Sequence, residues 1–220
     1  MSLQDKLDAI KAGFAAKAPP DVVAVMHKAT ADLIASGQAE RALKAGMRAP
    51  EFTLPDPHGE PVRSADLLQK GPLVLTFYRG VWCPFCNMDL QALEAAANDI
   101  RALGATLVAI SPQTAPNRRK SERENELSFP ILSDHGNALA DQFGLRFRLP
   151  DDLIAIYKGF GNDLAVGNGE DSWTLPMPAR YVIGSDGVIV YAEVNADYTR
   201  RPDPSELLPV LQRLKVDAAA

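Results

Sequence analysis

Two cysteines at the junction of a strand and a helix constrain this chain more than any other feature. The run 73–78, Leu-Val-Leu-Thr-Phe-Tyr, is short and largely apolar, which is typical of a central strand that is buried on both faces. After a turn at Arg79-Gly80, the sequence Trp-Cys-Pro-Phe-Cys (82–86) leads into a helix predicted over 84–103. The pattern therefore places Cys83 and Cys86 at the beginning of a helix.

The first turn of a helix is a position where a thiol becomes reactive. Its free backbone N–H groups and the positive end of the helix dipole stabilise a thiolate and lower the pKa of the cysteine. Cys83 and Cys86 are one turn apart, so the second thiol can release the product of the first as a disulfide. Pro84 suits the first turn, where its missing N–H costs nothing, and Trp82 is expected to cover the sulfurs. The pair predicts redox chemistry.

Three other interpretations of the pair are weaker. A structural disulfide would close a loop of only four residues, and the stabilisation it gives grows with loop length. Two inert, packed thiols would leave their shared place at a helix start unexplained. A structural zinc site needs four ligands, whereas His27, His58 and His135 are far apart in sequence. No cofactor or metal is implied, because the cysteines themselves carry the electrons.

The remaining pattern predicts an α/β fold with a mixed central sheet and helices on both faces. Residues 1–45 read as two helices broken at Pro19-Pro20, an N-terminal helical extension that would cover the core or form a homodimer interface. Residues 46–220 read as the main domain, and 145–176, rich in Gly, Asp and Pro, are expected to be mostly loop. Further helices are expected over 116–127, 137–143 and 204–214, with strands over 106–110, 129–132, 180–183 and 188–194.

Composition excludes some functions. The 220 residues carry a formal net charge of −5 and no basic cluster, which argues against a nucleic-acid partner. No apolar run approaches the ~20 residues that span a bilayer, so no membrane association is expected. The N-terminus lacks the basic-then-apolar pattern of a secretory signal. We therefore expect a cytoplasmic protein, in a compartment where free cysteines serve redox chemistry rather than structure.

From Gly46 onward the sequence resembles the peroxiredoxins, the alkyl hydroperoxide reductase/thiol-specific antioxidant (AhpC/TSA) family of the thioredoxin-fold superfamily. Several motifs carry the resemblance in the family's order. They are Gly-Met-Arg-Ala-Pro-Glu-Phe-Thr-Leu (46–54), Phe77-Tyr78, Phe-Pro-Ile-Leu-Ser-Asp (129–134) with a short helix ending at Gly144, and Tyr181-Val182-Ile183 with Asp186-Gly187. The resemblance implies a thioredoxin-like fold and an antioxidant thiol peroxidase.

The active-site motif departs from that family. Its P-x-x-x-T-x-x-C pattern aligns without gaps so that Arg79 replaces the proline, Cys83 the threonine, and Cys86 falls on the peroxidatic cysteine. The C-x-x-C that results resembles a thioredoxin. The family's catalytic arginine aligns with Pro178, which resembles the thioredoxin cis-proline, so Met177–Pro178 is a candidate cis bond. Arg180, two residues on, is expected to face the same side as Pro178; it either reaches the site or is a surface arginine.

Two mechanisms follow from the combination of a peroxiredoxin-like chain with a thioredoxin-like C-x-x-C motif. In the first, Cys86 attacks a hydroperoxide, Cys83 resolves the sulfenic acid, and a thioredoxin-like dithiol reduces the disulfide; Arg79 or Arg180 would replace the missing arginine. In the second, Cys83 attacks a protein or small disulfide as in thioredoxin, and Cys86 resolves the mixed disulfide. The breadth of the resemblance favours the first. A third hypothesis is a redox-inert interaction module that uses the N-terminal helices and residues 145–176.

Overall fold

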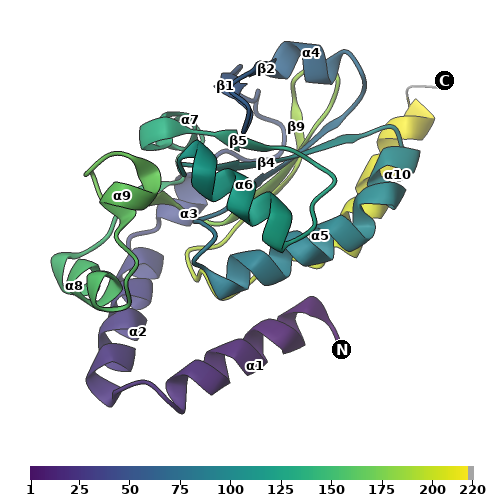
Figure 1. Cartoon of the computed structure of the whole chain (residues 1–220). Coiled ribbons are helices and arrows are strands. Elements are labelled where there is room, and N and C mark those ends of the chain that lie inside the picture. The colour runs from purple at the N-terminus through teal and green to yellow at the C-terminus, as the bar shows by residue number, and fades with distance from the viewer. Residues whose placement is uncertain (218–220) are drawn as a thin grey trace.

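A five-stranded mixed sheet forms the centre of the molecule in the computed structural model, which describes residues 1–217 (Figure 1). Its strand order is β5-β4-β3-β8-β9, with β3, β4 and β5 parallel and β8 and β9 antiparallel to their neighbours. Every residue of β3 is buried, as its apolar run predicts. The strands are β3 (Leu73–Phe77), β4 (Thr106–Ser111), β5 (Ile131–Ser133), β8 (Ala179–Ile183) and β9 (Ile189–Val194).

Helices cover both faces of this sheet, which confirms the predicted mixed α/β class. On one face, α5 (Pro84–Ala102) and α10 (Leu207–Asp217) pack with α1 (Leu3–Ala15) into one hydrophobic cluster. The other face is covered by α4 (Ser64–Leu68) and α7 (Ala138–Gln142). Ala218–Ala220, which end the predicted main domain, lie outside the described residues.

The smaller elements surround this core. The hairpin of β1 and β2 follows the N-terminal helices, α6 precedes β5, and a 3-10 turn precedes each of α7 and α10. Their bounds are β1 (Thr53–Pro55), β2 (Pro61–Arg63), α6 (Ala115–Glu124), η1 (His135–Asn137) and η2 (Pro204–Glu206).

The expectation of a long loop over 145–176 is wrong. The segment forms β6 (Arg146–Arg148), α8 (Asp151–Gly159), α9 (Leu164–Asn168) and β7 (Thr174–Pro176), with β6 and β7 paired antiparallel. The helix α8 carries two aspartates in its first turn, where the helix dipole favours negative charge. Its buried residues, spaced by one and three positions, form one apolar face that was overlooked; they are Leu153, Ile154 and Tyr157.

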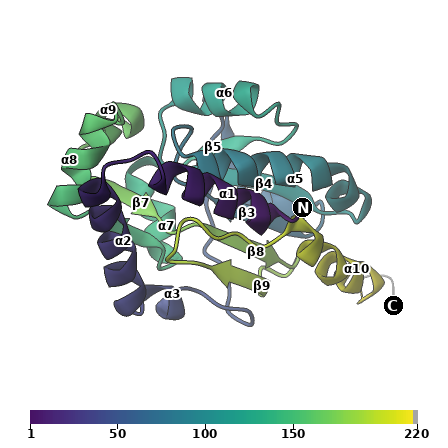
Figure 2. The ribbon, with the colours of Figure 1, turned by 90° about the horizontal axis from the view of Figure 1, so that it is seen from below.

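The N-terminal helices pack against the rest of the molecule. The helix α1 lies along α5 and buries Leu3 and Leu7, and α2 (Pro20–Ala35) contacts α8 (Figure 2). The break between them falls at Pro19-Pro20 as predicted, with Pro20 at the first helical position, and a short helix, α3 (Gln38–Arg41), follows α2. The division into residues 1–45 and 46–220 stays a prediction, and α1 shares the core of the main domain.

None of the helices within residues 1–217 has the length and apolar character that crossing a bilayer requires.

Candidate active site

The two cysteines face each other at the N-terminus of α5. Cys83 is the N-cap residue, and Pro84 occupies the first turn, where it has no N–H to satisfy. The backbone N–H of Cys86 donates to the carbonyl oxygen of Cys83, and the Cys86 and Cys83 Sγ atoms lie 2.7 Å apart as free thiols. Cys83 is 1 % exposed and Cys86 is fully buried. The pair is therefore placed for disulfide formation and shielded from bulk water.

Arg201 is the arginine that reaches a sulfur. Its Nη2 donates to the Sγ of Cys86 at 3.3 Å, and its Nη1 donates at 2.7 Å to each of the carbonyl oxygens of Tyr198 and Arg200. These backbone contacts fix the guanidinium against the loop that follows β9. The sequence singled out no role for Arg201, because nothing local shows that this loop returns to the start of α5.

A buried carboxylate links Arg201 to Arg180. The Oδ1 of Asp89 accepts from Nη2 of Arg180 at 2.5 Å, and its Oδ2 lies 3.4 Å from Nε of Arg201. Arg180 also donates from Nη1 to the carbonyl oxygen of Pro202 at 2.9 Å. Arg180 thus lies on the cysteine side of the sheet and holds Asp89 and the segment that carries Arg201.

Asp89 carried a signal that the sequence analysis overlooked. It lies three residues after Cys86 and four before Leu93, so it shares their buried helix face. A carboxylate on such a face needs a cation as partner, because burying an unpaired charge is very costly. The pattern alone therefore required an arginine or lysine from elsewhere in the chain.

Arg79 is enclosed by aromatic rings. Its guanidinium carbon lies 4.2 Å from the ring centroid of Tyr198, 4.9 Å from that of Trp82 and 5.6 Å from that of Tyr157. Its Nη2 also donates to the hydroxyl of Tyr157, a residue of the overlooked helix α8. Cation–π contact compensates for the loss of water around this buried charge. The guanidinium of Arg79 lowers the pKa of Cys86 through its positive charge, and the backbone N–H of Arg79 adds a hydrogen bond to the Cys86 sulfur.

The loop between β3 and α5 is held by Gln113. Its Oε1 accepts from the backbone N–H of Val81 at 2.8 Å, and its Nε2 donates to the hydroxyl of Tyr78 at 2.8 Å. At Gly80 the backbone has a φ of +155°, and a Cβ there would lie 2.5 Å from Nε1 of Trp82. Glycine at this position therefore allows the indole of Trp82 to lie against the loop.

The prediction of a cis bond before Pro178 is wrong, since the Met177–Pro178 peptide is trans. Pro178 leads directly into β8, and its carbonyl oxygen accepts from the N–H of Asn195 at 3.2 Å. The extended backbone of the sheet thus continues through it. Its ring lines a small cavity together with Asp89 and Arg180.

The two thiols have opposite pKa shifts. Burial raises the pKa of Cys86, but the hydrogen bond from Cys83 and the charges of Arg201 and Arg79 outweigh burial and lower it to about 6. Burial, the hydrogen bond to Cys86 and the charge of Cys86 raise the pKa of Cys83 well above its usual range. Near neutral pH the pair therefore consists of a Cys86 thiolate and a Cys83 thiol.

This assignment predicts the pH dependence of the reduced protein. Because the pKa of Cys86 is lowered, its thiolate is present above about pH 6 and is lost as the pH falls through that value. Titration followed by ultraviolet thiolate absorbance should show one thiolate per chain forming with a midpoint near pH 6, and no second one below pH 9. A single step near the pKa of a free cysteine, or two thiolates ionising together, would contradict the assignment.

No set of three or more histidine, cysteine, aspartate or glutamate side chains within residues 1–217 is arranged to hold a metal ion. The groups around the cysteines are instead guanidinium donors and aromatic rings. Such groups suit a thiolate and an oxygen-bearing substrate that develops negative charge.

Known proteins that are similar to this chain are peroxiredoxins. The family model described as AhpC/TSA matches residues 45–192. A putative peroxiredoxin of Mycobacterium tuberculosis is 31% identical over 114 residues, which cover 52% of this chain and 74% of the relative. The chloroplastic peroxiredoxin Q of Oryza sativa subsp. japonica is 29% identical over 169 residues, which cover 77% of this chain and 67% of the relative.

Solved structures share the fold at low sequence identity. Peroxidoxin BcpB from Mycobacterium tuberculosis superposes with a TM-score of 0.60 at 23% identity, covering 78% of this chain and 97% of its own. Peroxiredoxin Q of Xanthomonas campestris superposes with a TM-score of 0.57 at 17% identity, covering 79% of this chain and 98% of its own. The expected thioredoxin-like fold is thereby confirmed, and this chain belongs to the AhpC/TSA family of thiol-dependent peroxide reductases, the peroxiredoxins.

Proposed function

We propose that this chain is a thiol peroxidase in which Cys86 is the peroxidatic cysteine and Cys83 resolves it. The observation that carries the assignment is the environment of the Cys86 sulfur, which lies beside the Cys83 thiol at 2.7 Å and accepts from Arg201 at 3.3 Å. A thiol that is fully buried needs such partners to ionise near neutral pH. Cys83 has no arginine within hydrogen-bond distance, which suits it to the neutral, second role.

Reduction of one hydroperoxide to the alcohol needs only these two sulfurs, which end as a disulfide. The Cys86 thiolate attacks the terminal oxygen of a hydroperoxide, the O–O bond breaks, and the alkoxide leaves and is protonated to an alcohol. Cys86 becomes a sulfenic acid. The sulfur of Cys83 then attacks Cys86, and water is released as the disulfide forms. A thioredoxin-like dithiol, the general reductant of peroxiredoxins, returns the pair to two thiols.

Arg201 and Arg79 supply the electrostatics of the first step. As the O–O bond breaks, negative charge moves from sulfur to the departing oxygen, and positive groups fixed nearby stabilise that charge without reorganising. Asp89 and Arg180 are positioning residues, since Asp89 pairs with the Arg201 guanidinium and Arg180 holds Asp89 and the carbonyl oxygen of Pro202.

Thiol–disulfide exchange at Cys83 is the second candidate, and one observation favours it. Cys83 lines the pocket that opens in front of the site, together with Trp82 and Pro84, whereas Cys86 lies behind it. An external disulfide would therefore meet Cys83 first. The high pKa of Cys83 argues against this role, because the thiolate is the attacking species.

The deciding measurement is the second-order rate constant for oxidation of the reduced protein by hydrogen peroxide. We expect it to exceed that of a free thiol with a similar pKa by about 100-fold or more, since fixed donors at a developing charge contribute that much in other enzymes. A rate constant equal to that of the free thiol, with rapid reduction of a model disulfide, would replace the peroxidase by the exchange reaction.

A homodimer and a cytoplasmic location stay predictions.

A further inference from the structure

A pocket of about 490 Å³ lies directly in front of Cys83. Arg79, Trp82 and Cys83 line it on the side of the active site, while α1 and α2 supply much of the opposite wall. Hydrogen peroxide has only two heavy atoms, and a water molecule occupies ~30 Å³ of liquid, so the peroxide would fill a small part of this space. Volumes of this size are typical of pockets for organic ligands.

The wall facing the cysteines is largely apolar, although Lys11, His27 and Thr30 also line it. Several of its large side chains remain exposed, with Phe14 at 37 %, Phe160 at 47 % and Ile34 at 50 %. The rings of Phe14 and Phe160 meet edge to face at 6.1 Å between centroids, which joins the end of α1 to the end of α8. Exposed apolar groups gathered around one pocket indicate a ligand that covers them.

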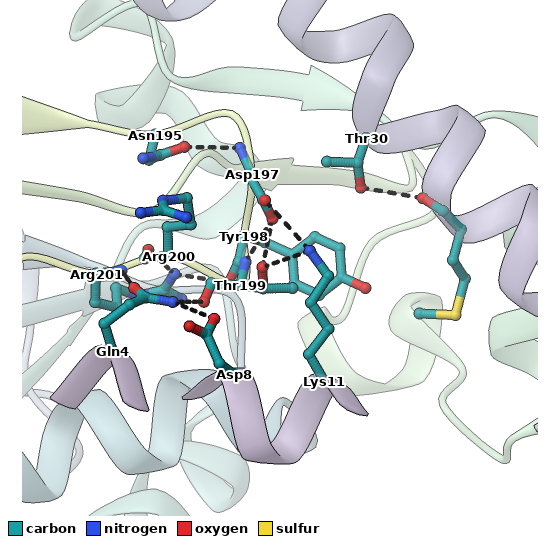
Figure 3. Close-up of polar contacts among 11 residues, drawn as sticks. Gln4, Asp8, Lys11, Thr30, Asn195, Asp197, Tyr198, Thr199, Arg200 and Arg201 are labelled. Atoms are coloured by element: carbon teal, nitrogen blue, oxygen red, sulfur yellow. Dashed lines mark hydrogen bonds and ion pairs between the residues drawn. The ribbon is translucent and has the colours of Figure 1, made fainter. Parts of the chain in front are cut away.

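The wall is also fixed relative to the cysteines. Lys11 of α1 lies 3.6 Å from a carboxylate oxygen of Asp197 and donates to the hydroxyl of Thr199 at 3.4 Å (Figure 3). The backbone N–H of Arg201 donates to Oε1 of Gln4 at 3.3 Å (Figure 3). These contacts tie α1 to the loop that carries Arg201. Both helices end before residue 45, so this wall lies outside the part of the chain that the family model matches.

We infer that this pocket binds the apolar group of a bulky organic hydroperoxide, and that α1 and α2 make the enzyme select such substrates over hydrogen peroxide. The inference rests on the proposed function. The hydroperoxide end points to the cysteines, and the Cys83 side chain must turn aside for its terminal oxygen to reach Cys86, which is fully buried. The O–O bond breaks as described above, and the alcohol product stays in the apolar pocket until release.

The test fills the pocket from α2. Ala31 is exposed and lines the pocket, whereas Ala24 is exposed on the same helix and does not line it, so Ala31→Trp and Ala24→Trp form a matched pair. The readout is loss of free thiols in single-turnover reactions with cumene hydroperoxide and with hydrogen peroxide. We expect the unmodified protein to react with cumene hydroperoxide about tenfold faster or more than with hydrogen peroxide. Burial of the aromatic ring in the pocket contributes a binding free energy that corresponds to such a factor.

Ala31→Trp should abolish this preference. Its rate constant for hydrogen peroxide should stay within about twofold of that of the unmodified protein, since substitutions at exposed positions usually have effects no larger than this. Ala24→Trp should change neither rate constant. No preference in the unmodified protein, or an equal loss for both hydroperoxides in Ala31→Trp, overturns the inference. A slower reduction of the disulfide by thioredoxin, with both hydroperoxides unchanged, would assign the pocket to the reductant and also overturn it.

A binding measurement separates this inference from the proposed function. The alcohol product of cumene hydroperoxide, 2-phenyl-2-propanol, is titrated into the reduced protein and followed by calorimetry, which needs no turnover. Saturable binding that Ala31→Trp removes and Ala24→Trp retains supports the pocket assignment. Absence of saturable binding overturns it even if both hydroperoxides are reduced. Binding of the alcohol by a protein that neither hydroperoxide oxidises overturns the proposed function alone.

Discussion

Replacing Cys86 by serine should abolish peroxide reduction, whereas replacing Cys83 by serine should leave one turnover intact. The Cys86 sulfur is the thiolate near neutral pH, and the remaining Cys83 thiol has a pKa well above its usual range, so Cys86→Ser lacks a nucleophile. In Cys83→Ser the serine hydroxyl replaces the donor to Cys86, and the sulfenic acid that forms has no partner to condense with. The measurement is consumption of hydrogen peroxide, together with labelling by dimedone, a reagent specific for sulfenic acids.

The expected pattern is one equivalent of peroxide consumed and one dimedone label per chain in Cys83→Ser, and neither in Cys86→Ser. Catalytic turnover with a dithiol reductant should be lost in both variants. The reverse pattern, with label only in Cys86→Ser, would make Cys83 the nucleophile. Circular dichroism of both variants serves as the control for folding, since both cysteines lie at the start of α5.

Replacing Arg201 by methionine should slow oxidation of the reduced protein at pH 7 by up to about 30-fold. Without the guanidinium, the pKa of Cys86 rises from about 6 toward that of a free cysteine, while the hydrogen bond from Cys83 and the charge of Arg79 continue to lower it. The thiolate fraction then falls from roughly nine-tenths to a few per cent at pH 7, if the free-cysteine pKa of ~8.5 is reached. The measurement is the rate of thiol oxidation by hydrogen peroxide as a function of pH.

The diagnostic feature is the shift of the pH profile, which a merely structural defect would not produce. Arg201→Lys keeps the charge without the planar guanidinium and should recover part of the shift. Arg200→Met is the matched control, because Arg200 is the adjacent residue and its side chain is exposed. A midpoint that stays near pH 6 in Arg201→Met would show that Arg79 and the Cys83 thiol suffice for ionisation.

The local parts of the site were open to prediction from sequence. A run of apolar residues, a proline one residue after a cysteine and a second cysteine one turn later describe a strand, a helix start and a dithiol, all within 73–86. Each of these features depends on near neighbours in the chain. The turn at Asp186-Gly187 is similarly local, and Gly187 has the positive φ of 81° that the motif requires.

The electrostatic part of the site was not open to prediction in the same way. The contact between Arg201 and Cys86 joins residues that are 115 positions apart in the sequence. Arg180 faces the cysteine side, but it donates its hydrogen bonds to Asp89 and to the carbonyl oxygen of Pro202. Tyr157 was missed for a different reason, since α8 is only nine residues long and its apolar face spans few positions. Asp89, a charged residue on the otherwise apolar buried face of α5, was a sequence signal of the network.

The buried charges around the dithiol also bear on how readily it is recycled. Arg180 and Arg201 share the carboxylate of Asp89, whereas the buried Arg79 is surrounded by aromatic rings, so the Cys86 thiolate supplies negative charge that Arg201 and Arg79 otherwise lack. Closing the disulfide removes that negative charge from beside Arg201 and Arg79. Groups that stabilise the thiolate therefore favour the reduced state over the disulfide and raise the reduction potential of the couple. The arginines that activate the cysteine also make its disulfide a stronger oxidant, which an external dithiol reduces with a larger driving force.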